Sequence, residues 1–367
     1  LLYCLFALFL VSFLVSGDLI AKKPKLTPEQ MLFNSAQGRE FWIAIPSNEQ
    51  PNFTTHSLEI YITSAKATNV RLELPSGQII NKQVKPFQIT TISTETGDIG
   101  WDLEIWESER ITEQGIHITA DQPLSVYVLN AKLTTSDGYL ALPVNALGTE
   151  YIHNSYYDFN EVYPWATGFV IVAANDFTRV RIELRGKGKG FAKTWGGRDI
   201  GDVIQIDNMM AGQTYYVRGD AKTAGMWDIS GSRITSNKPI GLISTHQRAR
   251  IPTFDLWNGR DHLSEMMPPV TAWGKKYYTV SFVRESGMGD YFRIIAAEDK
   301  TTWSVKWYDK VSKELIGQTG GQLNAGGFAE YLNITALPGQ PHEPSIVGTS
   351  IWEANKPVLV MQDAYSC

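Results

Sequence analysis

The chain is poor in cysteine, with only Cys4 and Cys367 among its 367 residues. Cys4 falls in an apolar N-terminal segment and Cys367 is the last residue, so a chain that has lost this segment cannot form an internal disulfide. A polypeptide of this length buries a sizeable core without one. An exported chain without internal cysteines is more typical of a bacterium than of an animal secretion.

The sequence also lacks basic runs and recognisable catalytic motifs. Lysine and arginine total 33 against 38 acidic residues, which gives a formal net charge of −5. This balance argues against a nucleic-acid partner. No phosphate loop, dinucleotide fingerprint or nucleophile motif is present, and the glycine-rich stretch 186–190 predicts a hairpin turn instead. We therefore expect no enzymatic activity, no cofactor and no metal.

The N-terminal segment predicts export. Residues 1–17 contain no charged side chain and end in the small residues Ser16 and Gly17, a pattern typical of a secretory signal peptide. A transmembrane anchor is the alternative, but this segment is at the short limit for a membrane span. We predict a secreted or cell-surface protein with no membrane span in its mature chain. Residues 18–37 are predicted to be a linker with a short helix at 27–35.

Internal repetition is the strongest feature of the sequence. A glycine followed three positions later by an aromatic residue opens three segments, at 38–42, 148–152 and 274–278. A second marker follows at 68–74, 178–184 and 301–307, and a third, which contains a proline, at 118–124, 234–240 and 351–358. The constant order predicts three copies of one module, at 38–147, 148–273 and 274–367. The third copy ends just after its closing strand, so we expect the natural chain to continue past residue 367.

The markers have the pattern of β-strands. Alternation of apolar and polar residues at 58–63 and 180–184 predicts strands with one buried face. Continuous apolar runs at 169–174 and 358–361 predict strands buried on both faces, and the proline of each closing marker predicts a strand entry. The predicted fold class is all-β, with three tandem β-sandwich-like modules. A propeller-like or pseudo-threefold arrangement of the repeats is the alternative.

Three stretches at 139–151, 231–239 and 261–274 read YLALPVNALGTEY, GSRITSNKP and DHLSEMMPPVTAWG. Together they resemble the IgGFc-binding protein N-terminal domain family, and the resemblance covers nearly all of the mature chain. It implies an extracellular binding or adhesion module. Because this chain lacks the cysteines of the animal members, it resembles a bacterial-type secreted or surface member. The family is named after an animal member, so the resemblance does not by itself imply that this chain binds immunoglobulin.

Two tryptophans and a polar connection are the candidate ligand-binding residues. Trp165 and Trp257 follow turn-like sequence and are predicted to expose an aromatic face on which a sugar stacks. Arg248 and Arg250 are planar donors suited to an acidic ligand, or else a solvated loop face.

Asp261 and His262 lie with Glu265 in the same connection. A helical turn would place His262 and Glu265 on one side, and imidazole and carboxylate groups bind metals. A zinc site needs at least three well-placed ligands, so a turn capped by an acidic side chain is the preferred interpretation.

These features favour a secreted or cell-surface binding module. The connections 132–145 and 246–269 occupy equivalent places between copies, and we expect them to present a surface to an extracellular glycan, mucin or protein. A structural repeat of a surface layer or stalk, which would self-associate, is the second hypothesis. A secreted hydrolase centred on His262 and Glu265 is the third.

Overall fold

The computed structural model describes residues 36–51, 55–160, 163–187, 193–222, 228–251, 259–282, 290–331, 346 and 348–364. The expected signal peptide, the helix at 27–35 and Trp257 lie outside these residues. Within them the regular structure is β-strand with three short 3-10 helices, so the all-β prediction is confirmed. No helix in this part of the chain has the length and apolar character needed to cross a membrane.

Most strands belong to three large sheets, which we call sheets I, II and III. Sheet I contains β1 (Gly38–Ile43), β3 (Thr55–Thr63), β4 (Thr68–Glu73), β5 (Ile79–Val84), β6 (Thr90–Ser93), β9 (Ile116–Lys132) and β10 (Thr135–Leu140). Sheet II contains β8 (Ile111–Thr112), β11 (Gly148–Ile152), β14 (Thr167–Ala173), β15 (Thr178–Glu183), β16 (Val203–Met209), β17 (Thr214–Arg218), β18 (Arg233–Ala249) and β19 (Asp261–Met266). Sheet III contains β20 (Gly274–Val280), β21 (Tyr291–Ala296), β22 (Thr301–Tyr308), β23 (Leu315–Leu323), β24 (Phe328–Tyr331) and β25 (Thr349–Asp363).

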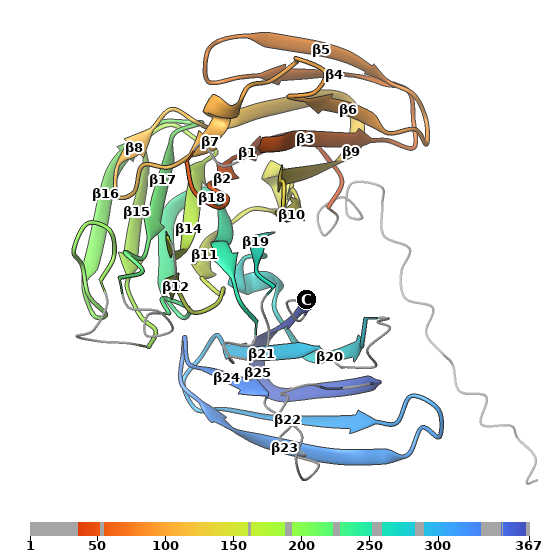
Figure 1. Ribbon diagram of the computed structural model, residues 1–367, viewed down its shortest axis with the longest axis vertical. Coiled ribbons are helices and arrows are strands. Elements are labelled where there is room, and N and C mark those ends of the chain that lie inside the picture. The colour runs from red at the N-terminus through yellow and green to blue at the C-terminus, as the bar shows by residue number, and fades with distance from the viewer. Residues whose placement is uncertain are drawn as a thin grey trace, which may run out of the picture.

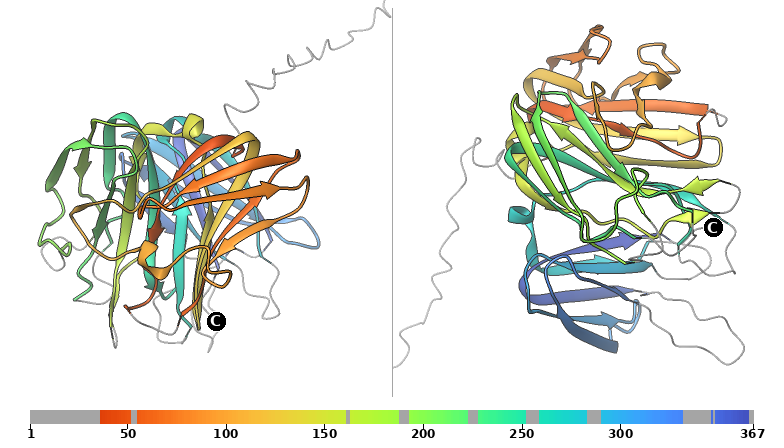
Figure 2. Two further views of the ribbon diagram at one scale, coloured as in Figure 1. Left: turned by 90° about the horizontal axis from the view of Figure 1, so that it is seen from above. Right: turned by 90° about the vertical axis from the view of Figure 1, so that its left-hand side faces the viewer.

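Short elements complete the described structure. Two small ribbons pair β2 (Ile45–Pro46) with β7 (Glu104–Ile105) and β12 (Phe159–Asn160) with β13 (Pro164–Trp165). The 3-10 helices are η1 (Trp101–Leu103), η2 (Val144–Ala146) and η3 (Val270–Ala272). Figure 1 shows the three sheets arranged around a common centre into which β25 runs, and Figure 2 shows them following one another along the long axis.

The three sheets share one strand order. Their central paths are β5-β4-β9-β3-β6, β16-β15-β18-β14-β17 and β23-β22-β25-β21-β24. The opening glycines also pair in equivalent places, Gly38 with Leu124, Gly148 with Ile240 and Gly274 with Val358. The sequence markers therefore occupy equivalent strands in each sheet.

One long strand organises each sheet. In sheet I, the first half of β9 lies between β1 and β4, and its second half lies between β3 and β10. Apolar side chains from both halves meet in one core that includes Phe41, Ile60, Leu72 and Val126. This makes each unit sandwich-like, with a strand that bends from one layer into the other.

The proline of each closing marker lies at this bend rather than at a strand entry. Pro123, Pro239 and Pro357 fall inside β9, β18 and β25. No ladder partner pairs with any of the three prolines in the described residues, because the strand changes neighbours there. The missing N–H of proline therefore costs little at this position. The prediction of a strand entry is wrong for this reason.

The opening glycines permit close packing against the linkers. A Cβ atom on Gly38 would lie 2.2 Å from Cβ of Pro143, and one on Gly148 would lie 2.4 Å from Cβ of Pro269. Both prolines immediately precede a 3-10 helix, η2 or η3. Each glycine is thus needed because a rigid proline ring occupies the space of a side chain.

Two buried arginine clusters join neighbouring sheets. Arg293 of β21 is fully buried, and its Nη1 lies 3.0 Å from Asp228 Oδ2 while its Nη2 lies 2.6 Å from Glu330 Oε1. Nη1 also donates to Ser230 Oγ at 3.0 Å, which ties sheet III to a segment that precedes β18 of sheet II. Between sheets I and II, Glu49 is 1% exposed and forms an ion pair with Arg248.

Candidate functional site

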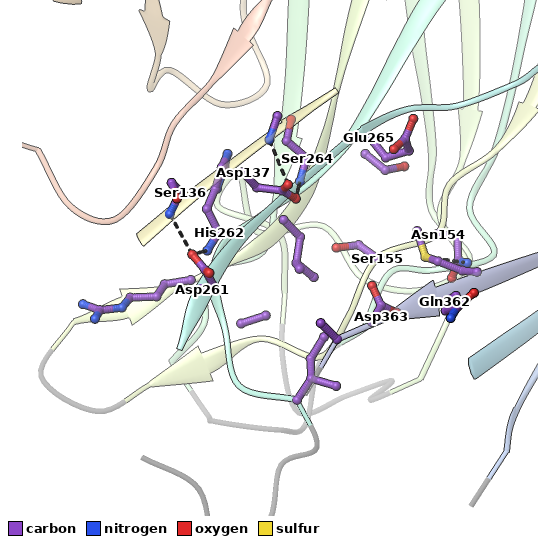
Figure 3. Close-up of a pocket in the computed structure, with 18 of the residues that line it drawn as sticks. Ser136, Asp137, Asn154, Ser155, Asp261, His262, Ser264, Glu265, Gln362 and Asp363 are labelled. Atoms are coloured by element: carbon purple, nitrogen blue, oxygen red, sulfur yellow. Dashed lines mark hydrogen bonds between the residues drawn. The ribbon is translucent and has the colours of Figure 1, made fainter. Parts of the chain in front are cut away.

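A cavity of about 930 Å³ lies where the three sheets meet. Its walls come from β10, β19, the residues after β11 and the end of β25. The polar and charged residues that line it include Ser136, Asp137, Asn154, Ser155, Arg248, Arg260, Asp261, His262, Ser264, Glu265, Gln362 and Asp363. Figure 3 shows Asp137 and Asp261 on neighbouring strands and Asp363 across the cavity on β25. The cavity therefore exists only because residues more than two hundred positions apart meet.

Strands β10 and β19 are joined side by side by their own polar groups. Ser136 N donates to Asp261 Oδ1 at 2.7 Å, His262 N donates to Thr135 Oγ1 at 2.8 Å, and Ser264 N donates to Asp137 Oδ2 at 2.8 Å. These bonds satisfy backbone donors that would otherwise face an open edge. The two connections that the sequence predicts to project as loops thus form a wall of the cavity.

Burial perturbs the acidic groups of the cavity. Burial raises the pKa of Asp137 to about 7, although this carboxylate accepts hydrogen bonds from Ser264 N and Gly138 N. Burial, together with the neighbouring Asp137, raises the pKa of Glu265 to about 7. The pKa of Asp363 rises to about 6, because burial outweighs the attraction of Arg293. Burial therefore holds part of this cluster protonated at neutral pH, and the carboxylates that do ionise carry a desolvation cost.

Arg248 and Arg260 line the cavity, but neither forms an ion pair with three of its carboxylates. Within the described residues, no lysine, arginine or histidine forms an ion pair with Asp137, Glu265 or Asp363. Arg248, which also lines the cavity, is held by Glu49 and donates to Thr134 Oγ1 at 3.1 Å. The site is consequently a cavity of acidic character that suits a cationic group.

The histidines are structural donors in this arrangement. His262 is 1% exposed and its Nδ1 lies 2.8 Å from the carbonyl oxygen of His246. Burial lowers the pKa of His262 to about 3 and that of His246 to about 4, so both rings are neutral at neutral pH. The helical turn that would bring His262 and Glu265 to one side does not form, because both lie on strand β19, where residues three apart point to opposite faces. The preferred interpretation, a turn capped by an acidic side chain, is wrong for the same reason, since Asp261 begins this strand. No group of three metal-ligating side chains occurs in the part of the chain that is described.

The expectation of an exposed Trp165 is wrong. This side chain is 2% exposed, and its indole N–H donates to Glu49 Oε1 at 3.0 Å. The guanidinium groups of Arg248 and Arg260 lie 5.4 and 5.8 Å from its ring centre. The indole face is thus covered by cations and cannot stack on a sugar in this conformation. Trp165 and its neighbours hold the junction of sheets I and II.

The other predicted residues divide between cavity and core. Arg248, Asp261 and His262 line the cavity, whereas Arg250 is 9% exposed and is not among its lining residues. Asp137, Glu265 and Asp363 form the acidic cluster, and sequence reasoning missed Asp137 and Asp363. The position of Asp137, within a connection equivalent to that of Asp261, is the signal that could have identified it.

The fold and the cavity define an all-β protein of three like sheets around a shared acidic cavity. The family model described as IgGFc binding protein matches residues 137–367, which is more than half of the chain. The chain therefore belongs to this family, and the resemblance seen in the sequence is confirmed. Human IgGFc-binding protein is 28% identical over 202 residues, which cover 53% of this chain and 3% of the human protein. The chain thus spans only a small part of this relative's length.

Proposed function

We propose that this chain is an extracellular protein-binding module that receives part of its partner at the acidic cavity. The name of the human relative refers to the Fc part of immunoglobulin G, which supports a protein as the partner class. The observation that carries the proposal is the cluster of Asp137, Glu265 and Asp363 without a paired cation on a cavity of about 930 Å³. A partner that supplies the cation recovers part of the desolvation cost of these carboxylates.

The cavity walls suit the binding of a ligand. They are built from strands that are hydrogen-bonded to neighbouring sheets, so the site is preformed and little ordering is needed on binding. Glycans and mucins are the alternative ligands, and surface-layer self-association is the alternative role.

The test is a binding panel with the purified chain. Immunoglobulin Fc, a purified mucin and a glycan array are probed by biolayer interferometry at low and physiological salt. The double variant Asp137→Asn and Glu265→Gln is compared with Glu314→Gln, an exposed carboxylate outside the cavity. Saturable protein binding that the double variant weakens at least about tenfold, and that the control retains, supports the proposal. Binding to glycans alone, or concentration-dependent assembly without any ligand, contradicts it.

A further inference from the structure

Arg218 is a buried cation that lacks an acidic partner in the part of the chain that is described. This residue ends β17 and is 6% exposed. Its Nε has no hydrogen-bond partner, and its Nη1 only approaches Gln247 Oε1, at 3.5 Å. A buried charge is normally paired, because an opposite charge offsets the cost of removing it from water. The guanidinium of Arg218 therefore keeps donors that no described group accepts.

The two carboxylates that flank Arg218 are held by other cations. Asp220 follows two residues later along the chain, and its Oδ2 lies 3.2 Å from Lys222 Nζ. Glu109 donates its backbone N–H to the carbonyl oxygen of the β17 residue 216, and its Oε2 lies 3.0 Å from Arg198 Nε. An anion from outside the chain would thus find a positive charge for which no neighbouring carboxylate competes.

A fixed turn holds Trp195 over this guanidinium. The ring centre of Trp195 lies 4.1 Å from Arg218 Cζ, and its backbone N donates to the carbonyl oxygen of Arg218 at 2.9 Å. Gly196 N donates to Glu109 Oε1 at 3.0 Å, and a Cβ on this glycine would lie 2.3 Å from Glu109 Oε2 and displace the carboxylate. Trp195 is nevertheless 56% exposed, so its indole is both fixed in place and open to solvent.

An exposed indole beside an unpaired guanidinium suits a sugar that carries a carboxylate. A guanidinium binds a carboxylate through charge-assisted hydrogen bonds in a planar fork. The flat apolar face of an indole packs against the C–H face of a sugar ring. A small acid without a ring would leave the indole unused, and a neutral sugar would leave the guanidinium without an anion.

We propose that Arg218 and Trp195 form a binding site for a sugar acid, in which the guanidinium takes the carboxylate and the indole takes the sugar ring. The site goes beyond the proposed protein-binding function, because neither residue lines the acidic cavity. Its charge also has the opposite sign, so the two sites select different ligands.

Glucuronate, glucose and acetate are the matched probes. Glucuronate carries both a ring and a carboxylate, glucose carries only the ring, and acetate carries only the carboxylate. Binding of each to the full chain is measured by calorimetry at low ionic strength. We expect glucuronate to bind at least about tenfold more tightly than glucose or acetate. Equal binding of either simpler probe, or no binding of glucuronate, would overturn the inference.

Three variants assign the binding to these side chains. Arg218→Met should weaken glucuronate binding at least about tenfold, and Trp195→Ala should weaken it about fivefold. The control is Phe177→Ala, which removes another exposed aromatic side chain, 62% exposed, whose ring centre lies 6.0 Å from Lys238 Nζ. Binding should be unchanged in this control. A control that loses as much binding as Trp195→Ala contradicts the assignment.

Thermal stability separates a ligand-binding arginine from a structural one. Since no described carboxylate loses its partner, Arg218→Met should lower the melting temperature of the free protein by no more than about 3 °C. A larger fall would mean that Arg218 serves the fold, and it would overturn the inference. Trp195→Ala, at an exposed position, tests the site independently of this measurement.

The cavity variants separate this inference from the proposed function. The double variant Asp137→Asn and Glu265→Gln should bind glucuronate as wild type does, and Arg218→Met should keep any protein partner found in the binding panel. If no protein binds while glucuronate does, the sugar-acid site stands and the proposed function must be revised. If a protein binds and glucuronate does not, the proposed function stands and the sugar-acid site fails.

Discussion

The buried Arg293 cluster gives the sharpest test of how sheet III is attached. Its guanidinium is fully buried together with Asp228, contacts Glu330, and lies 4.3 Å from the ring centre of Phe328. Arg293→Met keeps much of the apolar stem but leaves buried Asp228 without its cation, and leaves Glu330 with only Lys187 at 3.6 Å. Removal of one partner from a buried ion pair typically costs about 3–5 kcal/mol. We expect a loss of unfolding free energy in that range.

The assay is urea unfolding of the purified chain, with limited proteolysis at low urea concentration. The matched control is Lys276→Met in the same sheet, which breaks an exposed 2.7 Å ion pair with Glu353 whose side chains are 47% and 48% exposed. Exposed pairs contribute at most about 1 kcal/mol, so the control should remain close to wild type. Proteolysis of the Arg293 variant should release sheet III first.

The size of the effect decides whether the reasoning holds. An Arg293→Met variant within about 1 kcal/mol of wild type, or equal to Lys276→Met, would refute the argument that this cluster attaches sheet III. A double variant with Asp228→Asn adds a second check. If the two residues form one unit, Asp228→Asn should cost much less in the Met background than in wild type.

Three further predictions follow from the packing and the pKa values. The Tyr151 hydroxyl accepts a hydrogen bond from Gly148 N at 2.8 Å and donates one to the carbonyl oxygen of Ile240 at 2.7 Å. Tyr151→Phe removes both bonds and should lower the free energy of unfolding in urea by about 1–3 kcal/mol. An unchanged unfolding midpoint would contradict this. Gly148→Ala should cost about 1–3 kcal/mol because its Cβ would meet Pro269, whereas Gly321→Ala, whose nearest neighbour is 3.5 Å away, should be tolerated. Burial raises the pKa of Glu265 from 4.5 to about 7, so the folded protein favours the protonated side chain. The contribution of this side chain to the free energy of unfolding is fully present below pH 4.5 and is lost as the pH rises through 7. Glu265→Gln should therefore be about 3 kcal/mol more stable than wild type at pH 8 and little different at pH 4. A stability difference that does not depend on pH would contradict the assignment.

Local sequence pattern is sufficient to predict the strands. The alternation at 58–63 corresponds to alternate burial in β3, and the apolar run that begins at Phe169 lies in β14, every residue of which is buried. The apolar run at 358–361 is expected to be buried on both faces, but only Val358 is fully buried. Periodicity reports the character of a strand and not what packs beside it, so the partial burial of β25 beyond Val358 could not be predicted.

The candidate site is less accessible to sequence reasoning for the same physical reason. Asp137, Glu265 and Asp363 come from three strands that meet only after the sheets have assembled, and no short motif connects them. Turn-like residues before Trp165 predict a surface position, yet its burial depends on Glu49 and Arg248, which are distant in sequence. The connections 132–145 and 246–269 do share one environment, since β10 and β19 line the cavity together.

The core of sheet I has a consequence for the order in which the chain can fold during synthesis. Val170, Val172, Tyr216, Ile243 and Met266 pack into that core although all of them belong to sheet II. A nascent chain emerges from its N-terminus, so the first sheet is complete in sequence long before Met266 has been made. Its apolar surface therefore stays partly exposed while more than a hundred further residues are added. A chaperone that covers this surface until residue 266 emerges would protect the chain at its most aggregation-prone stage.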